Sequence, residues 1–296
     1  MVAILAVGPA FIYPVFLMKV MCFALFACAF NLLIGFGGLL SFGHAMFLGT
    51  AGYAAAHSAK VWGFTPELAV LFATACAALL GWVAGSLAIR RHGIYFAMIT
   101  LALAQMIFFF YLQAPFTGGE DGIQAVPRGK LFGFISLDGP AGMYPFVLAI
   151  FLAGFVLIWR IVNSPFGQIL KAIRENESRA ISLGYDTDRY KLIAFVLSGA
   201  LSGLAGGTKS LVFQLASLTD AHWSMSGEVV LMTLLGGLGT IFGPVVGAAI
   251  IITMQNYLAQ LGAWVTIVQG VIFVICVLAF RRGVIGEIAH AIRKPL

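Results

Sequence analysis

Residues 66–89 read PELAVLFATACAALLGWVAGSLAI, an apolar run whose one charged side chain, Glu67, lies at its start. A helix of about 20 apolar residues crosses the roughly 30 Å hydrocarbon core of a bilayer, so this run is long enough to span a membrane. Comparable runs, bounded by charges or by Pro and Gly, recur along the whole chain. We expect ten of them, at 1–18, 20–38, 44–59, 66–89, 94–114, 143–162, 191–208, 228–240, 243–259 and 263–280.

This pattern predicts an all-α fold, a polytopic transmembrane helix bundle with about 8–10 membrane segments and glycine-broken helices. The runs at 44–59 and 228–240 are short and contain glycine. Each is either a full crossing of the membrane or a helix that is re-entrant or broken. Lipid tolerates a re-entrant or broken helix only inside a protein cavity. We expect residues 1–296 to form a single transmembrane domain.

The composition excludes two other classes of protein. The chain is 61% hydrophobic and 9% charged, with a mean hydropathy of +1.02, whereas a soluble domain is about half apolar and about a quarter charged. Intrinsic disorder requires low hydrophobicity, and nucleic-acid binding requires a basic surface. The 17 Lys and Arg residues are spread over several loops. We therefore expect a lipid bilayer, and no nucleic acid, around this chain.

The basic residues are distributed unevenly between the loops, which predicts the topology. Twelve of the 17 fall on one side, which we expect to be cytoplasmic. They are Arg90, Arg91, Arg160, Lys171, Arg174, Arg179, Arg189, Lys191, Arg281, Arg282, Arg293 and Lys294. The other side receives Lys19, Lys60, Arg128, Lys130 and Lys209. With ten crossings, both termini face the cytoplasm.

Catalysis finds little support in the sequence. Acid–base and metal chemistry need convergent Asp, Glu, His or Cys side chains, and the apolar runs contain no such cluster. The cysteines, Cys22, Cys28, Cys76 and Cys276, are expected to be small buried apolar residues. Residues 203–210 resemble a phosphate-binding loop but have Thr208 in place of a glycine and lie in an apolar run. We expect no catalytic residue, metal or cofactor in this chain.

Polar and glycine residues inside the apolar runs are candidates for a transport path. We single out Ser41, His44, Gln105, Gly236 and Gly237; Asn31, Gln255 and Asn256 are further polar residues in or beside the bilayer. For His44 and Gln105 the alternative is a neutral side chain hydrogen-bonded to a neighbouring helix. The glycine-rich stretch 35–52 is expected to break a helix in mid-membrane and leave backbone groups to line a cavity.

Two longer connections separate the apolar runs. The external loop, about 115–142, opens on a flexible acidic turn that is either a contact for an external partner or a plain turn. Its candidate residues are Thr117, Gly118, Gly119 and Asp121. The connection at 163–190 predicts an amphipathic helix, because Ser164 and Pro165 suit its start and Gly184 its end. One stripe holds its apolar residues, Phe166, Ile169, Leu170, Ile173, Ala180 and Ile181. An interfacial helix and a docking helix for a cytoplasmic subunit both fit this pattern.

Five motifs, in order along the chain, resemble one family. The first two are Gly38-Leu39-Leu40-Ser41-Phe42-Gly43-His44-Ala45-Met46-Phe47 and Thr117 to Gly122. The third combines Ser164-Pro165-Phe166-Gly167, Ala172 to Ala180, and Leu183-Gly184. The fourth combines Leu234 to Thr240 with Gly243-Pro244, and the fifth is Arg282 to Gly286. The chain resembles LivM-type permease subunits of branched-chain amino-acid ABC importers over nearly its whole length. Arg281 stands where relatives often carry proline.

The resemblance implies a bacterial inner-membrane permease with several partners. These are a second homologous permease, two cytoplasmic ATP-binding subunits and a periplasmic substrate-binding protein. By the same resemblance, residues 164–184 are a coupling helix, with candidate contacts Arg174, Glu175, Glu177, Arg179, Ala180 and Gly184. The wider importer pattern is Glu-Ala-Ala, then three residues, then Gly. This sequence keeps it in part. Ala180 and Gly184 match the second Ala and the Gly, whereas Ser178 and Arg179 stand in place of the Glu and the first Ala.

The implied mechanism is alternating access, in which a branched-chain amino acid passes between two permeases. Permeases for urea, short amides or other amino acids match the motifs equally well. A solitary ion-coupled carrier or channel is an alternative from another class, and it needs a buried acid or His relay. Because Glu228 is placed at the edge of an apolar run, the sequence argues against that alternative.

Overall fold

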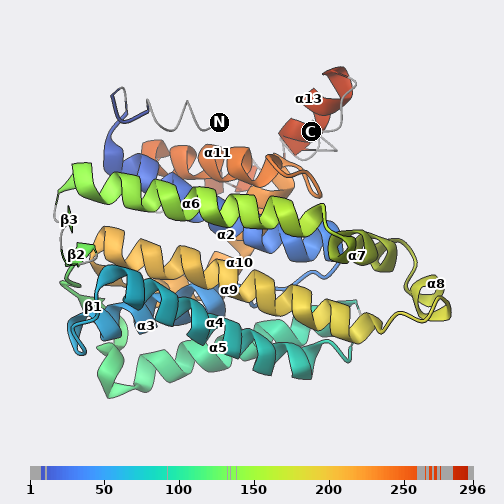
Figure 1. Ribbon diagram of the computed structural model, residues 1–296, viewed down its shortest axis with the longest axis horizontal. Helices are drawn as coiled ribbons and strands as arrows, with labels where there is room; N and C mark the ends of the chain where they lie inside the picture. Colours follow the sequence, from blue (N-terminus) through green and yellow to red (C-terminus); the bar gives the residue numbers. More distant parts are fainter. Residues whose placement is uncertain are drawn as a thin grey trace.

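The computed structural model describes residues 8–10, 12–91, 93–131, 133, 135–137 and 139–258, six positions between 264 and 274, and residues 283–292. Its long helices lie side by side along the longest axis of the molecule (Figure 1). The all-α, polytopic bundle predicted from the apolar runs is therefore confirmed.

Five helices in the described ranges are long and apolar enough to cross a membrane. They are α2 (Pro14–Asn31) with its π-helical continuation η2 (Leu32–Phe36), α4 (Pro66–Ala88), α5 (Ile94–Gln113), α6 (Pro140–Val162) and α9 (Thr187–Phe213). Proline occupies the first turn of α2, α4 and α6. Its missing N–H costs nothing there, because the first turn of a helix has no internal acceptor for it.

Three further helices in the described ranges are shorter, and glycine-rich turns interrupt the chain beside them. They are α3 (Ala45–Lys60), α10 (Trp223–Gly236) and α11 (Gly243–Leu258). At 1.5 Å per residue, the 14 residues of α10 extend over about 21 Å, less than a hydrocarbon core of roughly 30 Å. The segments expected to be short are indeed short. A last helix, α13 (Gly283–Ile292), places Gly283 against Gly237.

The predicted separation of segments 1–18 and 20–38 at Lys19 is wrong. Helix α2 begins at Pro14 and runs through Lys19 without interruption. A lysine near the end of a membrane helix keeps its ammonium group at a polar level while its stem packs on apolar groups, so it need not end the helix. Residues 1–7 of the first segment and most of 263–280 lie outside the described residues.

Two other boundaries also differ from prediction. Helix α9 continues beyond position 208 to Phe213, so Lys209 is helical, and its ammonium is neutralised by Asp220. Helix α10 begins at Trp223, which places Glu228 within the helix and not at the edge of a segment. In both cases a charged residue inside the bundle has a polar partner on a neighbouring element, which a single sequence does not reveal.

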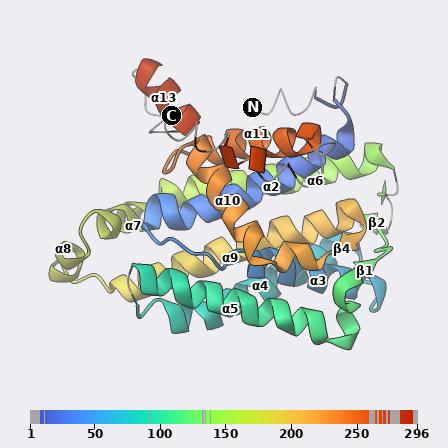
Figure 2. The ribbon, with the colours of Figure 1, turned by 180° about the vertical axis from the view of Figure 1, so that it is seen from behind.

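The two ends of the bundle differ in character. Short helices α7 (Pro165–Glu175) and α8 (Glu177–Ser182) project from one end, here called the α7 end (Figure 2). The opposite end, here called the β1 end, carries strands and 3-10 turns. These are β1 (Ile123–Gln124), β2 (Lys130–Leu131), β3 (Ile135–Ser136), β4 (Leu215–Ala216), η3 (Pro115–Thr117), η4 (Gly119–Asp121) and η5 (Leu218–Ala221); η1 (Gly8–Ala10) precedes α2. Strand β1 pairs antiparallel with β4, and β2 with β3.

Small residues let α9 approach α3 and α4 closely. A Cβ atom added to Gly203 would overlap Ala77 of α4, and one added to Gly206 would overlap the backbone of Leu48 in α3. Gly207 would place its Cβ 3.0 Å from the Cβ of Ala73. Because lipid removes the hydrophobic drive between helices, such close packing holds the bundle together.

This packing predicts that Gly206→Ala lowers stability. The new methyl group meets a backbone carbonyl that cannot rotate away, and overpacking of this kind costs about 1–3 kcal/mol. Gly227→Ala, in α10, is the matched control, since no described atom lies within 4 Å of its added Cβ. Thermal unfolding of the detergent-purified protein measures both variants. Equal midpoints would contradict the close approach of α3 and α9.

Candidate functional site

Helix α7 starts as its sequence predicts and is anchored to the bundle. The Ser164 hydroxyl accepts a hydrogen bond from the Gly167 N–H at 3.4 Å, and Pro165 fills the first turn. Leu170 and Ile173 are buried, and the Phe166 ring stacks on Tyr190 of α9 with centroids 5.7 Å apart. The amphipathic helix is therefore confirmed over 165–175, with its apolar face on the bundle.

The single helix predicted over 164–184 is wrong, because the chain breaks at Asn176. This residue is extended, with φ −157° and ψ 96°, and its side chain accepts a hydrogen bond from the Arg179 N–H at 3.0 Å. Asn competes with the helix by bonding local backbone groups, and here it caps a second helix, α8. The predicted apolar stripe fails beyond the break, where Ile181 is 56% exposed while Ala180 is buried.

Gly184 ends α8, as the sequence indicates. Its φ of +89° lies in the left-handed region, which suits glycine. The N–H groups of Gly184 and Tyr185 donate to the carbonyls of Ile181 and Ala180 at 2.9 and 3.2 Å. The preceding residue, Leu183, is 71% exposed. Helix α8 thus presents apolar side chains at the tip of the α7 end.

The remaining predicted coupling residues divide into two groups. Glu175 and Arg179 are exposed. Glu177 turns back to the bundle, where it accepts hydrogen bonds from the ammonium of Lys191 and, at 3.2 Å, from the hydroxyl of Thr187. Because both donors lie in α9, Glu177 fixes α8 to the start of that long helix.

Arg174 reaches the bundle despite its exposed position. Its Nη1 donates a hydrogen bond to the Gly35 carbonyl in η2. A Cβ on Gly38 would lie 2.6 Å from the Arg174 Cγ, and a Cβ on Gly239 would lie 3.5 Å from Nη1. The side chain therefore contacts two glycine-rich turns, at Gly38 and Gly239, that are 201 positions apart in the chain.

The two turns are also joined directly. The Asn31 side-chain amide donates to the Thr240 carbonyl at 2.8 Å, and its oxygen accepts from the Gly239 N–H at 3.1 Å. A Cβ on Gly35 would lie 2.7 Å from the Gly239 nitrogen. We call this cluster the glycine junction; its members are Asn31, Gly35, Gly38, Gly239 and Thr240. It holds the break after α2 against the break between α10 and α11.

Ser41 and His44 are fully buried at the start of α3. The Ser41 hydroxyl accepts from the Gly43 N–H at 3.2 Å. His44 Nε2 lies 2.8 Å from the hydroxyl of Ser198 in α9, which donates to the Ala29 carbonyl at 2.6 Å. The alternative in which His44 bonds a neighbouring helix is confirmed, and both side chains are fully buried in this conformation.

The other path candidates lie elsewhere. Gln105 is half-buried on α5, and no hydrogen bond joins its side chain to the described part of the chain. Gly236 ends α10 with its Cα against the Gly243 backbone, and Gly237 has a φ of +122°. The structure thus brings Gly236 and Gly237 beside the glycine junction and leaves Gln105 on a separate helix.

The external-loop candidates form a compact turn at the β1 end. Thr117 is buried, and its hydroxyl donates to the carbonyls of Tyr111 and Ala114, both at 2.6 Å. Gly118 and Gly119 have positive φ values, and Asp121 is exposed. Strand β1 then pairs with β4, which follows α9. This pairing attaches the loop to the helix that begins beside α8.

Comparison with known families settles the class of protein. The model of the permease component of branched-chain amino acid transport systems matches residues 12–277, which include the glycine junction, α7 and α8. The chain belongs to this family. It is therefore the permease subunit of an importer and a multi-pass membrane protein, in agreement with the motifs.

Several relatives resemble this permease. The high-affinity branched-chain amino acid permease LivM of Escherichia coli is 24% identical over 288 residues, 90% of this chain and 68% of the relative. The ribose import permease RbsC of Bacillus subtilis is 32% identical over 56% of this chain and 51% of its own. The autoinducer 2 import permease LsrC of an Enterobacter strain is 26% identical over 68% of this chain and 59% of its own. No solved structure matches.

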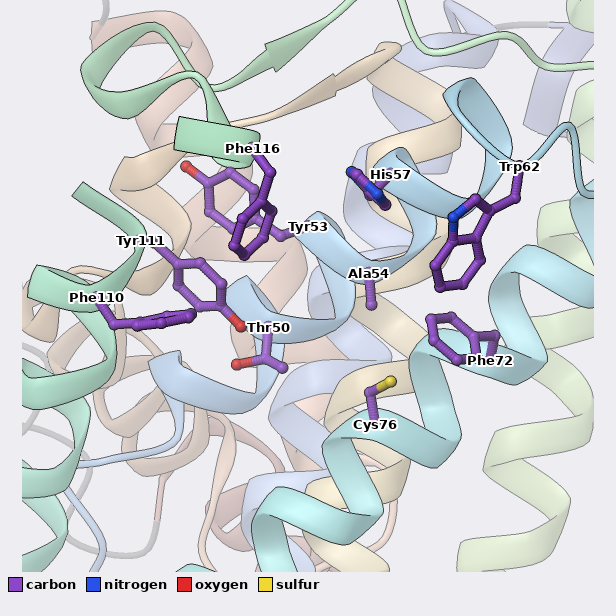
Figure 3. Close-up of a pocket in the computed structure, with 10 residues that line it drawn as sticks. All are labelled: Thr50, Tyr53, Ala54, His57, Trp62, Phe72, Cys76, Phe110, Tyr111 and Phe116. Carbon is purple, nitrogen blue, oxygen red and sulfur yellow. The ribbon is translucent and has the colours of Figure 1, made fainter. Parts of the chain in front are cut away.

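The permease also contains an aromatic cavity that the sequence did not indicate. It has a volume of about 500 Å³ and lies between α3, α4, α5 and η3 (Figure 3). Its lining residues are Thr50, Tyr53, Ala54, His57, Trp62, Phe72, Cys76, Phe110, Tyr111 and Phe116. The rings of Tyr53 and Tyr111 stack with centroids 4.6 Å apart. Because these residues come from α3, α4, α5, η3 and the turn between α3 and α4, no local pattern groups them. Such a lining accommodates apolar groups.

Proposed function

We propose that this permease carries branched-chain or other hydrophobic amino acids in an ATP-driven importer, by alternating access. In this proposal α7 and α8 dock on an ATP-binding subunit, and closure of that subunit moves the two helix breaks. The 163–190 connection then couples ATP hydrolysis to transport, and the α7 end faces the cytoplasm.

The observation that carries the proposal is the contact between Arg174 and the glycine junction. A projecting helix can transmit motion only if something links it to the membrane helices. Arg174 forms this link, since its guanidinium bonds Gly35 and lies beside Gly38 and Gly239. A hydrogen bond from a charged donor contributes about 1.5–3 kcal/mol, enough to bias two arrangements of helices strongly.

Orientation and partners follow from the same end of the molecule. Arg90 and Arg91 connect α4 to α5 at the α7 end (Figure 2), and such basic connections favour the cytoplasmic side. The β1 end, with Thr117, Gly118, Gly119 and Asp121, then meets a periplasmic substrate-binding protein. We expect two ATP-binding subunits below, a second homologous permease beside this chain, and the bacterial inner membrane around it.

Docking predicts a strong effect of reversing the exposed charge on α8. Arg179→Glu is expected to weaken binding of the ATP-binding subunits about tenfold, because a charge facing a partner surface becomes repulsive. Lys60→Glu, the same reversal at the β1 end, is the control. Co-purification at increasing salt measures both. Equal retention of the ATP-binding subunits would contradict the docking assignment.

The choice of solute rests on the relatives and on chemistry. LivM carries branched-chain amino acids by its name, whereas RbsC and LsrC import ribose and autoinducer 2. An apolar bundle with few polar groups favours a solute with an aliphatic side chain. Urea, short amides and other amino acids stay as alternative solutes, and a solitary ion-coupled carrier as an alternative mechanism.

Uptake by the reconstituted importer tests this proposal. Proteoliposomes containing both permeases and the ATP-binding subunits, with the binding protein outside, are expected to accumulate labelled leucine, isoleucine and valine only with internal ATP. Unlabelled ribose or urea should not compete. Leucine uptake driven by an ion gradient without ATP, or preferential uptake of ribose, would contradict the proposal.

A further inference from the structure

The aromatic cavity takes no part in the docking of α7 and α8 or in the glycine junction. Its volume of about 500 Å³ lies within the range of roughly 300–1,000 Å³ that is usual for small-molecule sites. Helix α3, most of whose residues are buried, forms its floor, and α4 and α5 form its sides (Figure 3). Water is a poor occupant, because the lining offers few polar partners.

Contacts between rings hold the walls of this cavity in place. Phe72 of α4 contacts Trp62 with centroids 5.3 Å apart, and Trp62 contacts His57 of α3 at 5.6 Å. The His57 ring meets Phe116 of η3 at 5.8 Å, and Phe116 meets Phe110 of α5 at 6.1 Å. Rings at such separations attract one another. The cavity is therefore a formed feature of the fold, since its lining joins all the elements that surround it.

The cavity extends from the β1 end to about the middle of the membrane. Helix α4 begins at Pro66, and its deepest lining residue, Cys76, lies ten positions further along. At 1.5 Å per residue this is about 15 Å, half of a hydrocarbon core of roughly 30 Å. On α3, Thr50 likewise lies ten positions from the last helical residue, Lys60. The depth of the cavity therefore matches one leaflet of acyl chains.

The cavity is also continuous with the apolar outer surface of the bundle. Fewer than half of the residues of α4 and α5 are buried, whereas 89% of those in α2 with η2 are. The lining rings of Trp62, Phe110 and Phe116 are each about half exposed. Beside them, Leu71 of α4 and Phe109 of α5 are exposed as well. An acyl chain of a surrounding lipid can therefore enter between α4 and α5 without crossing a polar surface.

A polar side chain lies where the cavity approaches the β1 end. His57 is half-buried, one turn before the end of α3, and no hydrogen bond joins its imidazole to any described residue. Its neighbour Trp62 is of the type that gathers at the boundary between acyl chains and headgroups. A polar group at this level and apolar walls below it match a molecule with a polar head and a hydrocarbon chain.

We propose that the aromatic cavity binds one acyl chain of a phospholipid from the leaflet at the β1 end, with the headgroup beside His57. The chain contacts the ring faces and fills a space whose lining would otherwise lack partner atoms. Because the chain leaves lipid and not water, close packing drives its binding. The bound lipid then wedges α4 and α5 apart on α3. This inference goes beyond the proposed function and stands without it.

Photolabelling by a phospholipid tests the site. The complete importer is reconstituted with phosphatidylglycerol that carries a diazirine in the middle of one acyl chain. After irradiation, mass spectrometry maps the residues that carry the label. We expect labelling of Phe72 and Cys76, which line the cavity, and we expect excess unlabelled phosphatidylglycerol to reduce it.

Filling the cavity with a side chain separates a bound lipid from general contact with the bilayer. Ala54→Phe adds a ring on the floor of the cavity and is expected to reduce labelling of Cys76 about tenfold, because chain and ring would then overpack the space. Ala75→Phe adds the same ring to the exposed face of α4 and is the control. Should Ala54→Phe fail to fold, Cys76→Phe fills the cavity from α4, and labelling of Phe72 decides.

Four results would overturn the lipid site. Phe72 and Cys76 could carry no label, or Ala54→Phe could be labelled as strongly as Ala75→Phe. Displacement of the label by excess leucine would make the cavity part of the transport path. Labelling of the isolated permease but not of the complete importer would show that another subunit covers the cavity. None of these measurements depends on uptake, so a failure of the proposed function is distinguishable from a failure of this site.

Discussion

Replacing Arg174 by Met is expected to lower leucine transport by about tenfold to a hundredfold while ATP hydrolysis continues. The substitution keeps much of the side-chain stem but removes the donor to the Gly35 carbonyl. A charge-assisted hydrogen bond of about 1.5–3 kcal/mol corresponds to that range, since about 1.4 kcal/mol is a factor of ten. Uptake and phosphate release measured on the same proteoliposomes give the number of leucine molecules moved per ATP.

Arg189→Met is the control for this prediction. Arg189 also lies at the α7 end, but its side chain is 83% exposed and, among the described residues, pairs only with Asp186, three residues before it. Exposed pairs of this kind contribute little. If both variants reduce the transport ratio equally, net charge at this end is responsible and the contact with Gly35 is not.

The second large effect is expected for Gly38→Ala. Gly38 has a φ of +69°, and its added Cβ would lie 2.6 Å from the Arg174 Cγ. The methyl group therefore pushes Arg174 away from the glycine junction. We expect transport to fall by at least about tenfold, because the guanidinium can no longer reach Gly35 without strain. Binding of the ATP-binding subunits should persist, since the exposed residues of α8 are untouched.

Gly63→Ala matches Gly38→Ala in backbone strain and differs in its surroundings. Gly63 has a φ of +66°, and no atom of the described chain lies within 4 Å of its added Cβ. Both substitutions thus introduce a similar cost of about 1–2 kcal/mol for a left-handed conformation. Normal transport in Gly38→Ala, or an equal loss in Gly63→Ala, would show that the contact with Arg174 is not needed.

Local sequence patterns predict the long helices well. The run at 66–89 becomes α4 at Pro66–Ala88, because a lipid environment requires uninterrupted helix over that length. The errors occur where charges find distant partners. The apolar pattern ends at position 208, yet Lys209 pairs with Asp220 and stays within α9. A pattern of charge along the chain cannot show such a pairing.

The structure of the projecting segment is predicted at its two ends and differs in the middle. Ser164 and Gly184 mark the start and end of the projecting segment correctly. Asn176 breaks the segment in the middle because its side chain caps α8. An Asn side chain that bonds local backbone groups competes with helix continuation, and the sequence does not show which of the two prevails. Arg174, a candidate contact for a partner subunit, bonds a carbonyl 139 positions away, which no local pattern indicates. Whether Arg174 also contacts the ATP-binding subunit stays a prediction.

Photo-crosslinking from position 183 tests the docking of α8 most directly. A benzophenone amino acid replaces Leu183, which is 71% exposed, and the complete importer is irradiated in native membranes. Mass spectrometry is expected to identify an ATP-binding subunit as the crosslinked protein, and the same probe at position 63, at the β1 end, should give no such adduct. Adducts from position 183 with lipid alone would contradict the account and make α8 an interfacial helix.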